Sequence, residues 1–149
     1  MDRRRAYLDS PVLLRRLLRQ PDALSNLSEW DLFSSELLGV EVRRTLHCYC
    51  AAQLFSEQDL ARRTAEFQAL LAAVDQVPVS KAILNRAGRP LGGALGTLDA
   101  IHLVTAMFWS EYNGEEVAIL THDRELAFAA RQRPCRSPVT DPPAKREVT

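Results

Sequence analysis

Short apolar segments alternate with helical segments along most of this chain, and this alternation constrains its fold most strongly. Strand candidates lie at 6–8, 31–34, 76–79 and 116–120, and the last of these has the clearest β pattern. Apolar residues recur at helical spacing over 11–20, 36–55, 57–74, 81–86, 98–112 and 124–132, and 22–30 has room for one more helical turn. Strands that alternate with helices favour a mainly parallel sheet of four or five strands, flanked by helices on both faces.

Local signals mark where several of these elements begin. Ser56 with Asp59 has the spacing of a capping box, and Ser80 is placed to cap the short helix that follows it. Thr97 is the expected N-cap of the helix over 98–112. Pro78 cannot donate a backbone hydrogen bond, so the strand at 76–79 is expected at an edge of the sheet.

The length of the chain suits one domain. Its 149 residues bury a sizeable core without disulfides or metals as staples. We expect this domain over 1–133, followed by a disordered tail over 134–149 that contains Pro134, Pro138, Pro142 and Pro143. Those prolines leave at most Val139 for a further strand.

Charge and cysteine content exclude several classes of protein. The formal net charge is zero, so no overall field draws the molecule to nucleic acid or to an anionic membrane. The three cysteines, Cys48, Cys50 and Cys135, are an odd number and suit a reducing cytoplasm better than a disulfide scaffold. The basic N-terminus has no long apolar segment after it, and no run is long enough to span a bilayer. We therefore expect a cytoplasmic protein.

Four acidic residues are expected near one edge of the sheet. Asp9 and Asp123 come directly after apolar strands, and the carboxyl ends of parallel strands share one edge, where ligands bind in open α/β sheets. Asp99 opens a helix that can begin at the same edge, and Glu41 lies one to two turns into the helix after the second strand. Each acid also has an ordinary explanation: Asp9 as a strand-end acid, Glu41 as an exposed helix residue, Asp99 and Asp123 at helix starts.

If these carboxylates meet, their repulsion calls for a cation. Two unit charges about 4 Å apart repel by roughly 4 kcal/mol at an effective dielectric constant of 20. Protonation or a bound cation relieves that energy, and oxygen ligands suit Mg²⁺ or Mn²⁺ better than zinc. Such an ion activates water and stabilises charge on a phosphoryl group. Hydrolysis of a phosphodiester is the reaction that this chemistry favours.

Four motifs resemble those of the PIN domains, and in particular the VapC-type toxins of bacterial toxin–antitoxin pairs. They read YLDS at 7–10, SELLGVEVRR at 35–44, TLDAIHL at 97–103 and LTHDREL at 120–126. Their order and spacing also match, and the likeness runs from about residue 5 to residue 130. The first strand departs from the family, because arginines at positions 3, 4 and 5 stand where apolar residues are usual.

The resemblance implies a PIN-like three-layer sandwich and a ribonuclease that depends on Mg²⁺ or Mn²⁺. It places Asp9, Glu41, Asp99 and Asp123 in the catalytic acidic cluster, with Asp9 and Asp99 as metal ligands, and it places Ser10 and Thr121 at hydroxyl positions beside the site. It also implies an RNA substrate, a homodimer and a small antitoxin as protein partner. Glu36 is interpreted as facing outward, and His102 as a helix-packing residue. Arg15, Arg16 and Arg44 are candidates for holding the RNA backbone.

Other functions stay open at this stage. The main alternative is a catalytically silent PIN-fold module that binds RNA or protein without cutting. Aspartate-based phosphotransferases and receiver domains fit less well. Pro11 occupies the place of the second aspartate in the former, and the only lysines are Lys81 and Lys145, which does not suit the latter.

Overall fold

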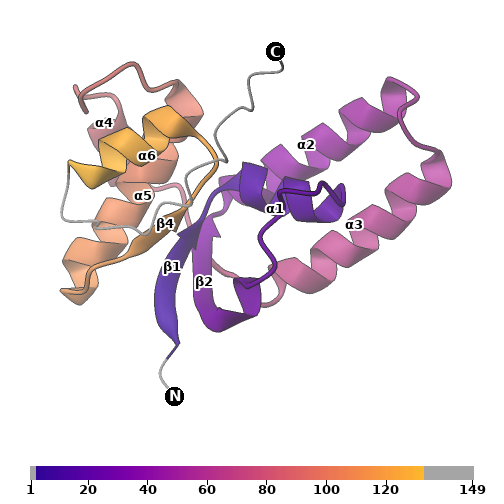
Figure 1. Ribbon diagram of the computed structural model, residues 1–149. Coiled ribbons are helices and arrows are strands. Elements are labelled where there is room, and N and C mark those ends of the chain that lie inside the picture. The colour runs from indigo at the N-terminus through magenta and orange to yellow at the C-terminus, as the bar shows by residue number, and fades with distance from the viewer. Residues whose placement is uncertain (1–2, 133–149) are drawn as a thin grey trace, which may run out of the picture.

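A four-stranded parallel sheet lies between two layers of helices in the computed structural model, which describes residues 3–132 (Figure 1). The sheet order is β3-β2-β1-β4, with β1 at Arg4–Leu8, β2 at Trp30–Ser35, β3 at Asp75–Val77 and β4 at Ala118–Leu120. The predicted fold class, a PIN-like three-layer α/β sandwich, is confirmed. The predicted domain boundary at 133 and the proline-rich segment 134–149, Val139 included, lie outside the described residues.

Among the described residues, six α-helices form the two outer layers. One layer holds α1 (Ser10–Leu17), α2 (Leu37–Ala51) and α3 (Glu57–Leu71); the other holds α4 (Lys81–Ala87), α5 (Thr97–Asn113) and α6 (Arg124–Arg131) (Figure 1). A short 3₁₀-helix, η1 (Leu27–Glu29), precedes β2. Within residues 3–132, no helix has both the length and the apolar character needed to cross a membrane.

The alternation of side chains along β1 supplies both halves of the core. Ala6 and Leu8 point to the layer of α1, α2 and α3, where they join a buried cluster that includes Phe67. Tyr7 points to the opposite layer and packs with Phe33 and with apolar residues of α5 and α6. Because successive strand residues face opposite sides, a strand of five residues can serve both layers.

The predicted helix starts at Ser56 and Ser80 are confirmed. The capping box of Ser56 and Asp59 is present in full, and the Ser80 hydroxyl accepts from the backbone N–H of Ile83 at 3.2 Å. The prediction that Thr97 caps α5 is wrong: Gly96 is the N-cap, with no side-chain cap, and Thr97 is the first helical residue. A helix tolerates this start because its first turn also contains Asp99, whose charge suits the positive end of the helix dipole.

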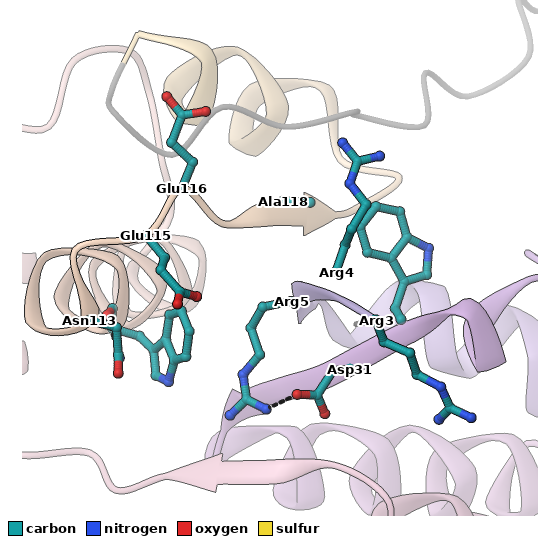
Figure 2. Close-up of a pocket in the computed structure, with 10 residues that line it drawn as sticks. Arg3, Arg4, Arg5, Asp31, Asn113, Glu115, Glu116 and Ala118 are labelled. Atoms are coloured by element: carbon teal, nitrogen blue, oxygen red, sulfur yellow. Dashed lines mark hydrogen bonds and ion pairs between the residues drawn. The ribbon is translucent and has the colours of Figure 1, made fainter. Parts of the chain in front are cut away.

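The first strand is longer than its apolar segment. Arg4 and Arg5 belong to β1, where Arg4 lies 5.6 Å from the ring centroid of Trp30 and the charge of Arg5 has carboxylate partners. The Arg5 guanidinium lies 2.5 Å from Asp31 (Figure 2). It also lies 2.7 Å from Asp75 and stacks 4.9 Å from the ring centroid of Trp109. The aliphatic part of an arginine packs well on aromatic rings, so this position accepts a cation where an apolar residue would otherwise stand.

We predict that Phe67→Ala lowers the free energy of unfolding by about 3–5 kcal/mol, because Phe67 is fully buried between α3 and the sheet and its loss leaves a cavity. Phe128→Ala is the matched control, since Phe128 is 57% exposed on α6, and we expect a change within about 0.5 kcal/mol. Urea unfolding followed by circular dichroism measures both. Equal losses in the two variants would contradict the assignment of the core.

Candidate active site

Asp9 lies at the carboxyl end of β1 and is almost completely buried, with 1% of its surface exposed. Its backbone N–H donates to the carbonyl of Leu120, which extends the pairing of β1 with β4 by one residue. The Ser10 backbone N–H donates to Asp9 Oδ1 at 3.0 Å, and the Thr121 hydroxyl donates to Asp9 Oδ2 at 2.7 Å. Two neighbouring strands thus fix the orientation of this carboxylate.

Asp99 and Asp123 approach the same edge from the layer of α5 and α6. Asp99 lies in the first turn of α5 and is partly buried, and its charge is close enough to Asp123, Glu41 and Asp9 to interact with each. Asp123 is the N-cap of α6: its Oδ1 accepts from the backbone N–H of Leu126 at 2.9 Å. The capping explanation for Asp123 therefore applies, and its charge also contributes to the cluster.

Glu41 reaches the cluster from the opposite helical layer. It lies on α2, and its side chain is 19% exposed. Oε2 accepts from the Ser10 hydroxyl at 3.2 Å, and Oε1 is hydrogen-bonded to Nε2 of His102. Glu41 is thus held at both carboxylate oxygens, unlike an exposed helix residue.

His102 forms hydrogen bonds through both ring nitrogens, which its interpretation as a helix-packing residue from the sequence does not include. It is 1% exposed on α5, and its Nδ1 is hydrogen-bonded to the hydroxyl of Tyr7, which itself accepts from the backbone N–H of Ser35 at 3.1 Å. The spacing of three residues between Asp99 and His102 was the available signal, because residues i and i+3 share a helix face. Nothing in the local pattern around Tyr7 indicates its hydrogen-bonding role.

Burial and like charge act together on the acids. Burial, reinforced by the charges of Asp99 and Glu41, raises the pKa of Asp9 to about 6, although His102 and the Thr121 hydroxyl act in the opposite direction. The pKa of Asp99 is raised as well, first by burial and then by Asp123. Ionised carboxylates in this pocket therefore lack sufficient positive charge from the protein itself.

The pKa values of His102 and of His122, which adjoins Thr121 and Asp123 in sequence, shift in opposite directions. Burial alone would lower the pKa of His102, but its hydrogen bond to Glu41 and the surrounding carboxylates raise it. Burial, followed by the charge of Arg15, lowers the pKa of His122. Neither ring nitrogen of His122 has a hydrogen-bond partner among the described residues.

The donor set fits a hard divalent cation held by few protein ligands. Asp9 and Asp99 supply carboxylate oxygens, with the hydroxyl of Thr121 and the carboxylates of Glu41 and Asp123 around them. Within residues 3–132, no group of three or more His, Cys, Asp or Glu side chains is close enough together to hold one ion. A pair of carboxylates completed by water is typical of Mg²⁺, which keeps several of its waters in proteins.

Other predicted positions also have defined places. Glu36 is exposed and stays outside the cluster, where its Oε1 accepts from the backbone N–H of Val79 at 2.8 Å. Arg15 forms a salt bridge with Asp22, while Arg44 is exposed on α2, one turn after Glu41.

A cavity of about 620 Å³ opens at the other edge of the sheet, lined by Arg4, Trp30, Glu115 and Arg5 with its partner Asp31 (Figure 2). Its charges include both signs, and it lies away from the four acids. We therefore assign the candidate active site to the acidic edge, where buried charge is uncompensated.

No protein-family model matches this chain. Over 129 residues it is 36% identical to Ribonuclease VapC46 of Mycobacterium tuberculosis (strain ATCC 25618 / H37Rv), and the aligned region covers 84% of this chain and 89% of that protein. Identity at this level over most of both chains shows that this protein belongs to the VapC ribonuclease family.

Proposed function

We propose that this protein is a PIN-type endoribonuclease that hydrolyses RNA with Mg²⁺ or Mn²⁺ and acts as the toxin of a toxin–antitoxin pair. Asp9 and Asp99 are the proposed metal ligands, and Glu41 and Asp123 complete the catalytic acidic cluster. The activity rests on the relationship to a protein named as a ribonuclease. The metal site is supported by one observation: burial, together with the nearby charges of Asp99 and Glu41, raises the pKa of the Asp9 carboxylate to about 6.

The chemistry assigns separate tasks to the residues of the site. A bound divalent ion supplies neutralising charge and makes water a better nucleophile toward a phosphodiester. The Thr121 hydroxyl and the Ser10 backbone N–H orient the carboxylate of Asp9 through its two oxygens. Glu41, fixed by Ser10 and His102, adds a carboxylate that accepts hydrogen bonds from water at the reacting phosphate.

RNA binding needs cations near this acidic edge, because the substrate backbone is itself negative. The guanidinium of Arg15 is held in a salt bridge with Asp22. Arg44 is exposed and lies one turn after Glu41 on the same helix. We therefore favour Arg44 over Arg15 as a contact to the phosphate backbone.

We predict that Asp99→Asn abolishes RNA cleavage, with a loss of at least about 100-fold in kcat, because removing one carboxylate removes a proposed metal ligand. Asp31→Asn is the matched control, since Asp31 is an aspartate at the opposite edge of the sheet, and we expect it to keep the wild-type rate. Cleavage of a structured RNA in the presence of Mg²⁺, Mn²⁺ or EDTA, followed on gels, measures the rates of the wild type and both variants.

The main alternative function, a silent binding module, makes different predictions for the same assay. It predicts no cleavage with any divalent ion and an RNA affinity that Asp99→Asn does not change. Wild-type cleavage in EDTA would instead contradict metal dependence while leaving the nuclease activity in place.

We predict that Asp9→Asn stabilises the metal-free protein at pH 7.5 by about 1–3 kcal/mol, because the wild type must ionise a buried carboxylate whose pKa rises from 3.8 to about 6 on folding. The folded wild type binds this proton more tightly than the unfolded chain, so its stability falls as the pH rises from about 4 to about 6. The gain from Asp9→Asn should therefore nearly vanish at pH 4.

Urea unfolding in EDTA at both pH values measures this difference. Mg²⁺ should stabilise the wild type and leave Asp9→Asn unchanged. A large loss of stability in Asp9→Asn at pH 7.5 would show that Asp9 stabilises the fold as a carboxylate, against its assignment as a functional group.

The toxin role has its own test. We predict that regulated expression in bacteria arrests growth with the wild type and not with Asp9→Asn, because arrest requires RNA cleavage. Co-expression of a small protein encoded next to the gene should relieve the arrest if that protein is the antitoxin. Gel filtration of the purified toxin should separately show the proposed homodimer. Equal arrest by both variants, at equal protein levels, would contradict a toxic nuclease activity.

A further inference from the structure

A chain of hydrogen bonds connects the buried core to the acidic cluster. It begins at Tyr7 on β1, passes through the imidazole of His102 on α5, and reaches the carboxylate of Glu41 on α2. From Glu41 it continues to the hydroxyl of Ser10, beside Asp9. The hydrogen bonds thus link β1, α5, α2 and α1, and α5 and α1, from opposite helical layers, both contact the side chain of Glu41 on α2.

The direction of the central hydrogen bond follows from the chemistry of its two partners. An ionised carboxylate only accepts hydrogen bonds, so His102 Nε2 carries a hydrogen and donates it to Glu41 Oε1. Nε2 is the donor to Glu41 whether the imidazole is neutral or protonated. The other ring nitrogen meets the Tyr7 hydroxyl, which can donate or accept there while it accepts from the backbone N–H of Ser35 at 3.1 Å.

Tyr7 and His102 are more deeply buried than Glu41, the residue that they hold in place. Tyr7 is 0% exposed and His102 is 1% exposed, whereas the side chain of Glu41 is 19% exposed and has three rotatable bonds. Without His102, the Ser10 hydroxyl at 3.2 Å would be the only hydrogen-bond donor left to this carboxylate among residues 3–132. Repulsion from Asp9 and Asp99 would then favour rotamers of Glu41 that point to solvent.

We propose that His102, held by Tyr7, is a positioning residue that fixes the carboxylate of Glu41 beside Asp9. The expected effect on RNA cleavage rests on the proposed nuclease function. The placement of Glu41 by His102 rests on the hydrogen bonds alone. A packing role does not account for a histidine at position 102. An apolar residue of similar size would fill the same space, whereas His102 also forms two buried hydrogen bonds.

The kinetic test compares His102→Leu with His102→Gln and Tyr7→Phe. We expect His102→Leu to lower kcat for RNA cleavage by about 10–100-fold and to leave KM within about threefold, because outer-shell residues of metal sites have effects of this size and RNA still binds. His102→Gln keeps an N–H donor for Glu41 and should recover part of the rate. Tyr7→Phe should lie between His102→Leu and the wild type.

Thr105→Val is the matched control for replacing a buried polar residue on α5. Thr105 is 1% exposed, one turn after Ile101, and its hydroxyl donates only to the carbonyl of Ile101 at 2.7 Å. The Thr105→Val variant should cleave RNA at the wild-type rate. If His102→Leu folds and also keeps the wild-type kcat, the positioning role is overturned; if His102→Leu does not fold, the rates of His102→Gln and Tyr7→Phe decide in the same way.

A second readout needs no enzymatic activity. In ¹H–¹⁵N spectra of the metal-free protein, the Nε2–H of His102 should give a signal protected from solvent exchange. Glu41→Ala should remove it and Asp99→Asn should retain it. A wild type that shows this signal and cuts no RNA would contradict the proposed function and leave the positioning intact, whereas a signal unaffected by Glu41→Ala would overturn the positioning itself.

Discussion

The structure depends on the burial of one charged group at the end of its central strand. Asp9 extends β1 into the pairing with β4 through its backbone N–H to Leu120, so its backbone is fixed at the end of the sheet. Two donors orient the carboxylate, yet burial still raises its pKa to about 6. The fold therefore holds a carboxylate where ionisation is unfavourable, and such an arrangement is common where function sets the residue rather than stability.

The placement of that residue was predictable because it follows from topology. Strands that alternate with helices favour a parallel sheet, and a parallel sheet gathers its strand ends at one edge. Asp9 and Asp123 follow β1 and β4, which are neighbours in the sheet, and this explains how residues far apart in sequence lie at the same edge. The capping box at Ser56 and the edge position of β3 were predictable from local chemistry alone.

The parts that could not be predicted depend on partners distant in sequence. Arg5 is a poor candidate for a sheet residue until Asp31 and Asp75, which lie on two other strands, neutralise it. His102 has the local pattern of a packing residue because its partners, Tyr7 and Glu41, belong to other elements. Thr97 was placed at the cap because a threonine suits that position, but the preceding glycine takes it.

The two edges of the sheet explain why a net charge of zero is compatible with a strongly charged site. At the amino-terminal edge, Arg5 is compensated by two carboxylates and stacks on Trp109, so its charge stabilises the packing of β1. At the carboxyl-terminal edge, Asp9 and Asp99 have raised pKa values even with His102 close by. A compensated charge needs nothing further, whereas an uncompensated buried charge requires protonation or a cation from solution. This difference, rather than the number of charges, is what separates a structural charge cluster from a candidate catalytic one in this protein.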